Sequence, residues 1–158
     1  MNSKPSGVES RLTHLDTKGE ASMVDVSAKP IQLREAIAGG EIHLQSATLD
    51  LIERNEISKG NVLATARLAG IIAAKKTGDL IPLCHPLPIT HCEVNFTIPP
   101  ERNRIVITAS AKIAAQTGIE MEALAAVSVA ALTIYDMCKA VDKQMIIGGI
   151  HLISKTKK

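Results

Sequence analysis

Residues 123–135 form a run of thirteen amino acids without a charged side chain, and this run lies inside a strongly helical segment, Thr117–Lys139. A helix that is apolar on all sides has to be buried on all sides. One sheet in a chain of 158 residues can cover only one face of such a helix. We therefore expect the other face to pack against another subunit, which predicts a homo-oligomer, most often a symmetric one.

Composition excludes several classes of function. Thirteen apolar residues fall short of the roughly 20 that span a bilayer, and the polar N-terminus has no signal-peptide pattern. Three cysteines without framework spacing favour a reducing compartment. A net charge of +2, with Phe96 and Tyr135 as the two aromatic residues, argues against a nucleic-acid partner that stacks bases. We expect a soluble cytoplasmic protein that binds neither membranes nor nucleic acid.

Hydrophobic periodicity and the positions of Pro and Gly predict the remaining elements. Residues 1–20 are polar and expected to be mobile, whereas 21–158 should form a single domain. The chain begins with an extended region from Met23 to about Leu44, broken at Gly39-Gly40, and a short helix near 48–53 follows. A second helix starts at about Lys59 and ends at a left-handed Gly in Thr77-Gly78, and strands are predicted at 89–98 and 104–115. The long helix is opened by a capping box of Thr117 and Glu120, and a last strand lies near 145–153. This β-α-α-β-β-α-β order is typical of a ferredoxin-like α/β (α+β) fold, an antiparallel sheet covered by helices, here with an added helix.

Asp136 and Lys139 lie three residues apart at the end of the long helix and project from the same side. Lys139 suits the negative end of the helix dipole, whereas Asp136 is placed against it. An acid in this position needs a compensating group. The structural interpretation is an ion pair with a lysine, and the functional one is a role for Asp136 in acid–base chemistry.

His85 stands between Pro82 and Pro86 in the segment Leu80–Pro88, where three prolines forbid a helix. A histidine held in a stiff loop can act as an acid, a base or a hydrogen-bond donor near neutral pH. The alternative is a histidine that only satisfies backbone groups of the loop.

Three further charged residues are candidates of lower specificity. Glu120 and Glu122 lie in the first turn of the long helix, where acidic side chains are also favoured on structural grounds. Lys59 is near a predicted helix start, where phosphate binding is natural, although most helix-surface lysines are simply solvated.

The residues Cys84, His85, His91 and Cys92 are of types that bind zinc. They come as adjacent pairs, however, and not at the separation of two to four residues that zinc sites use. His91 and Cys92 would also point to opposite faces of the predicted strand. We predict no metal site, and a zinc-dependent interaction module stays as an alternative.

Four segments resemble the molybdenum-cofactor biosynthesis protein C family. They are Met23–Lys29 (MVDVSAK), Leu80–Pro86 (LIPLCHP), Thr117–Leu124 (TGIEMEAL) and Ala131–Ala140 (ALTIYDMCKA), within a resemblance that runs from about Leu12 to Lys155. The resemblance implies a ferredoxin-like fold, a hexamer built from dimers with active sites between subunits, and no organic cofactor. It also implies a lyase that converts 3′,8-cyclo-7,8-dihydroguanosine 5′-triphosphate to cyclic pyranopterin monophosphate and pyrophosphate.

Site residues follow from the same resemblance. Asp136 corresponds to the acid/base residue of the family and Lys139 to its catalytic partner. The implied substrate-binding residues are Leu83, Cys84, His85, Met121, Glu122, Lys59, Glu120 and Lys155. Gln32-Leu33 and His151 depart from the family pattern, which often has Thr with a basic residue and Arg at these places. The alternative is an oligomer that binds purine triphosphates without converting them, although binding alone needs no acid at Asp136.

Overall fold

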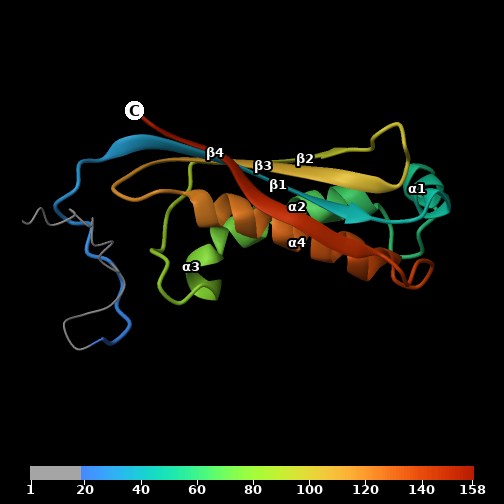
Figure 1. The fold of residues 1–158 in the computed structure, drawn as a ribbon, viewed down its shortest axis with the longest axis horizontal. Helices are drawn as coiled ribbons and strands as arrows, with labels where there is room; N and C mark the ends of the chain where they lie inside the picture. Colours follow the sequence, from blue (N-terminus) through green and yellow to red (C-terminus); the bar gives the residue numbers. More distant parts are fainter. Residues whose placement is uncertain (1–18) are drawn as a thin grey trace, which may run out of the picture.

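The computed structural model describes residues 19–158, so most of the N-terminal segment predicted to be mobile lies outside the described part. A four-stranded antiparallel sheet in the order β2-β3-β1-β4 forms one layer, and helices cover one of its faces (Figure 1). The elements are β1 (Gln32–His43), α1 (Ser46–Glu53), α2 (Val62–Lys75), α3 (Thr77–Leu80), β2 (His91–Thr97), β3 (Arg104–Ala115), α4 (Glu120–Cys138) and β4 (Ile146–Lys157). The predicted α+β class, an antiparallel sheet covered by helices, is confirmed.

The sheet buries the side of β3 that faces the helices. Ile105, Ile107, Ala109, Ala111 and Ile113 are buried, whereas the residues that alternate with them are more exposed, as period-two alternation requires. The predicted strand 104–115 is confirmed, and its partners β1 and β2 both run antiparallel to it. The core between this face and the helices is aliphatic, because Ile, Val and Ala fill it.

The long helix α4 packs against β1, β3 and α2 and is the centre of the core. Small residues allow close contact with α2: a Cβ added at Gly70 would lie 2.8 Å from the backbone oxygen of Ala126. In the single chain the helix is not buried on every side, since 58% of Leu132 is exposed. By length and composition α4 is apolar enough to cross a membrane, but half of its most apolar stretch is buried in the chain, and core helices pass the same test.

Two predicted helix boundaries are wrong. Thr117 does not cap α4, because the N-cap position is Ile119 and no side chain caps it. Glu120 pairs instead with Lys155 of β4. Gly78 is not a left-handed cap of α2 either; α2 ends at Lys75, and Gly78 lies inside the short helix α3.

The expected break at Gly39-Gly40 is also wrong, since β1 runs through both glycines. The irregularity lies in the pairing with β4, whose register shifts on both sides of Gly39. A Cβ at Gly40 would lie 2.8 Å from Val127 of α4, so the glycine permits close packing of the helix on the strand. β4 also continues beyond the predicted end to Lys157, and Lys158 still forms backbone hydrogen bonds with Leu33.

Candidate active site

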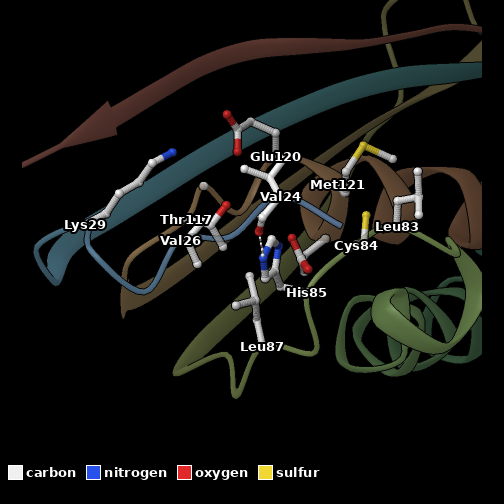
Figure 2. A pocket seen from close by; sticks show the side chains of 12 residues that line it. Val24, Val26, Lys29, Leu83, Cys84, His85, Leu87, Thr117, Glu120 and Met121 are labelled. Carbon is white, nitrogen blue, oxygen red and sulfur yellow. Dashed lines mark hydrogen bonds between the residues drawn. The ribbon is translucent and has the colours of Figure 1, made fainter. Parts of the chain in front are cut away.

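A pocket of about 300 Å³ lies between the start of α4, the loop after α3 and the segment that precedes β1 (Figure 2). The loop is stiff because prolines occupy three of its positions. Six of the predicted substrate-binding residues line this pocket together: Leu83, Cys84, His85, Glu120, Met121 and Glu122. Segments far apart in the sequence therefore meet at one place, as a binding site requires.

His85 is held by a hydrogen bond to a distant segment. Its Nε2 atom lies 2.8 Å from the backbone oxygen of Val24. A carbonyl oxygen only accepts hydrogen bonds, so Nε2 carries the proton and, in the neutral ring, Nδ1 remains an acceptor. The histidine does satisfy a backbone group, but the partner belongs to the segment before β1 and not to its own loop.

The two glutamates of the pocket differ in acidity. Glu122 is buried, and burial raises the pKa of its carboxyl, with Glu120 nearby raising it further. Burial also opposes ionisation of Glu120, but its own backbone N–H, the ammonium of Lys155 at 3.0 Å and the charge of Arg34 outweigh that effect and lower its pKa. Neighbouring carboxyls whose pKa values are pushed apart are suited to separate acid and base roles.

Cys84 is a neutral thiol in this pocket. Partial burial raises its pKa, and the carboxyl of Glu122 raises it further. The thiol form is a weak nucleophile, so Cys84 is suited to contact with a ligand and not to covalent catalysis.

Lys59, Asp136 and Lys139 form a second cluster at the C-terminal end of α4. The ammonium of Lys139 lies 2.7 Å from one carboxylate oxygen of Asp136, and that of Lys59 lies 2.7 Å from the other. These two hydrogen bonds lower the pKa of Asp136 to about 2, and Asp136 in turn raises the pKa of Lys139. The compensating group expected for Asp136 is thus two lysines, one of them from the loop before α2.

A profile of the MoaC family matches residues 23–158. The chain belongs to the MoaC family. The cyclic pyranopterin monophosphate synthase of Clostridium perfringens is 55% identical over 148 residues, 94% of either chain. The proteins of the same name from Desulforapulum autotrophicum and Chloroflexus aggregans are 59% and 58% identical, and cover 91% and 95% of this chain and 88% and 91% of their own.

The structure does not bring all predicted site residues of this MoaC-family chain together. Glu120 and Asp136 are sixteen residues apart in one helix, which at ~1.5 Å per residue separates them by about 24 Å. The pocket residues and Lys155 therefore gather at one end of α4, and the Asp136 cluster at the other. Asn61 caps the start of α2, and the ammonium of Lys59, in the loop before it, contacts Asp136.

Sequence reasoning missed part of the pocket lining. Val24, Val26 and Lys29 of the segment before β1 face the same space as His85, together with Thr117 (Figure 2). The family-like motif Met23–Lys29 was the available signal, but the sequence of an extended segment does not show against which part of the fold it packs.

The part of the chain that the structure describes contains no cluster of side chains that would support the zinc alternative. No group of three or more His, Cys, Asp or Glu side chains in residues 19–158 is arranged to hold a metal ion. His91 is exposed beside Glu93, whereas Cys92 packs toward the core from the same strand.

The positions that depart from the family pattern lie outside the His85 pocket. The side-chain amide oxygen of Gln32 accepts a hydrogen bond from the guanidinium of Arg34, which lines a neighbouring pocket beside Glu120 and Lys155. Leu33 is exposed, and His151 contacts the backbone oxygen of Gly149 on β4. Gln32 thus contacts a residue that lines the same pocket as Glu120 and Lys155.

Proposed function

We propose that this chain is a cyclic pyranopterin monophosphate synthase, a lyase of molybdenum-cofactor biosynthesis. Its substrate is 3′,8-cyclo-7,8-dihydroguanosine 5′-triphosphate, and its products are cyclic pyranopterin monophosphate and pyrophosphate. The observation that carries the proposal is the identity of 55–59% to relatives that bear this name, over at least nine tenths of the chain. No organic cofactor is required, because ring rearrangement and phosphate cyclisation proceed by proton transfer and displacement.

The active site is proposed to be completed by a second copy of the chain. Proton transfer needs the donor and acceptor within about 3 Å, whereas about 24 Å separate the ends of α4 in one copy. Lys59, Asp136 and Lys139 of one copy would face the His85 pocket of another. The exposed Leu132 of α4 and Leu68 of α2, 58% and 60% exposed in the single chain, are suited to burial in such an assembly, which we propose to be a hexamer of three dimers.

The roles follow from the protonation states. The ion pair keeps Lys139 protonated and Asp136 ionised. Lys139 gives a proton to the purine-derived ring, and the Asp136 carboxylate holds the Lys139 ammonium in place. Burial raises the pKa of Glu122, so of the two pocket carboxyls it is the one better suited to donate a proton. In the cyclisation a hydroxyl oxygen of the substrate attacks the α-phosphorus, its proton passes to a base, and the bond to the β-phosphate breaks with release of pyrophosphate.

A cytoplasmic location is proposed because Cys84, Cys92 and Cys138 are all unpaired thiols. Such thiols persist where the cell keeps cysteines reduced.

A single-turnover assay tests the reaction. The purified protein is mixed with the cyclised GTP derivative, and pyrophosphate and pterin product are followed together. We expect both products in equal amounts, and Asp136→Asn should nearly abolish their formation while the assembly stays intact. Binding of the substrate without either product would instead identify a non-catalytic nucleotide-binding protein, and unchanged turnover in Asp136→Asn would remove Asp136 from the mechanism.

Subunit complementation tests the shared site. Asp136→Asn and Glu122→Gln each inactivate one half-site, and the two inactive proteins are unfolded, mixed and refolded together. If each site takes one half from each of two copies, random mixing restores wild-type halves in about one quarter of the sites. If every site lay within one chain, the mixture would stay inactive.

A further inference from the structure

Residues 23–29, here called the strap, are held beside the His85 pocket by hydrogen bonds. Two side chains hold the strap from outside: His85 at the backbone oxygen of Val24, 2.8 Å away, and Gln116, whose amide donates to the backbone oxygen of Ser27 at 3.1 Å. Two bonds fold it from within, Ser27 N–H to the Asp25 carboxylate and Lys29 N–H to the oxygen of Val26, each 2.9 Å long. These contacts therefore hold the strap, a largely exposed segment outside the sheet, in one backbone conformation.

Lys29 is the last residue of the strap and lies at the rim of the pocket. Figure 2 shows its side chain extended on the side of the pocket where Glu120 lies. Lys29 is exposed, and within residues 19–158 its ammonium group takes part in no hydrogen bond or ion pair. The other lysines near the proposed half-sites are engaged: Lys155 with Glu120, and Lys59 and Lys139 with Asp136.

The pocket needs such a free cation if it receives a polyphosphate. Apart from Lys29 and His85, its charged lining consists of the carboxyls of Glu120 and Glu122. Carboxylates repel a phosphate chain, and Lys155 is partly neutralised by the carboxylate that it already contacts. A free ammonium on a pre-shaped segment provides attraction without first breaking an ion pair.

We infer that Lys29 binds the phosphate chain of the substrate, and that Gln116 is a positioning residue that holds the strap so that Lys29 faces the pocket. The inference rests on the proposed function for the identity of the substrate, and it adds a phosphate contact to that site. The ligand class it predicts for the strap is a linear polyphosphate, so inorganic triphosphate alone should bind there.

The first experiment measures binding and turnover separately. Inorganic triphosphate is titrated calorimetrically into the wild-type protein and into Lys29→Gln, Lys29→Arg and, as a matched control, Arg54→Gln. Arg54 is an exposed cation at the C-cap of α1, outside the residues that line the pocket. We expect Lys29→Gln to weaken triphosphate binding and to raise KM for the cyclised substrate about tenfold, with little change in kcat. Lys29→Arg, which keeps the charge, should stay within about threefold of wild type.

The second experiment tests the positioning role. Gln116→Leu should raise KM about threefold or more without lowering kcat, and should have no further effect when Lys29 is already Gln, because the two residues act through one contact. Additive effects in the double variant would show that Gln116 acts elsewhere and would overturn its role.

Unchanged triphosphate affinity in Lys29→Gln, or an equal loss in Arg54→Gln, would show that Lys29 is an ordinary solvated lysine and would overturn the inference. Failure of the proposed function looks different. A wild-type protein that binds triphosphate but releases no pyrophosphate from the cyclised substrate is not a synthase, and the binding titrations alone then decide the role of Lys29.

Discussion

Replacing Asp142 by Asn should destabilise the fold more than any exposed charge change. Asp142 follows α4 in the chain and is 1% exposed. Its carboxylate accepts hydrogen bonds from the backbone N–H of Gln45 at 2.9 Å, the hydroxyl of Thr48 at 3.1 Å and the backbone N–H of Gln144 at 3.1 Å. Gln45 is the N-cap of α1 and its own side chain caps nothing, so Asp142 supplies the cap from the other end of the sequence.

The magnitude follows from these contacts. In Asp142→Asn one acceptor oxygen becomes an NH₂ group, which cannot accept, so a buried donor loses its partner at a cost of about 1–3 kcal/mol. Loss of the negative charge at the positive end of α1 adds about 0.3–1 kcal/mol. We expect the free energy of unfolding to fall by about 2–3 kcal/mol, measured by urea denaturation at pH 7 with the protomer concentration held constant.

The pH dependence provides an internal check. Burial raises the pKa of Asp142, but the hydrogen bonds from Gln45, Gln144 and Thr48 outweigh it and lower the pKa below the ordinary 3.8. The stabilisation is therefore complete above pH 3.8 and is lost as the pH falls below it, so the wild-type and variant curves should converge in acid. As a control, Asp79→Asn removes an exposed pair with Lys76 and should change stability by less than ~0.5 kcal/mol. A loss of that small size in Asp142→Asn would refute the reasoning.

Three further outcomes follow from the packing and the site. Gly70→Ala should lower the free energy of unfolding by about 1–2 kcal/mol in thermal melts, because the new methyl group meets Ala126 and overpacking exceeds the gain in helix propensity; a more stable variant would contradict this. Wild-type turnover should decline as the pH rises through the raised pKa of Glu122. Glu122→Gln should lose most activity, and its remaining turnover should no longer show this decline. If the decline persists in the variant, it belongs to another group. Leu132→Glu should reduce the assembly size in sedimentation velocity, since it places a charge on the exposed apolar face of α4, and an unchanged size would place Leu132 outside the interface.

The order of elements was predictable because it depends on local patterns. β3 has strict alternation of buried residues, and its bounds at Arg104 and Ala115 were predicted without error. The helix boundaries at Thr117 and Gly78 were not, since the residues that satisfy these helix ends are chosen by tertiary contacts. Glu120 fits a capping box locally, but Lys155, 35 residues away in sequence, is the partner that it contacts.

The candidate site was predictable only as a set of residue types. Proline spacing marked His85, and the dipole argument marked Asp136 as a residue that needs compensation. Neither pattern predicts against which part of the fold a loop or the strap packs. The contact of His85 with Val24 and the position of Lys29 could therefore be found only in the folded structure. The second lysine on Asp136 was likewise hidden, because Lys59 approaches it from a loop 77 residues away.

The uncharged stretch of α4 connects the fold to the proposed site. Charged residues occur at both ends of this helix, and thirteen uncharged residues separate them. Burial in the core forbids charge in the middle, so ionisable groups that belong to one helix can act only at its ends. A rigid core helix of this length cannot bend its ends together, and a site that uses both therefore has to recruit the opposite end from a second copy. If the proposed site uses both ends of α4, the oligomer is a condition of catalysis, and variants that separate the subunits should lose turnover even when each chain stays folded.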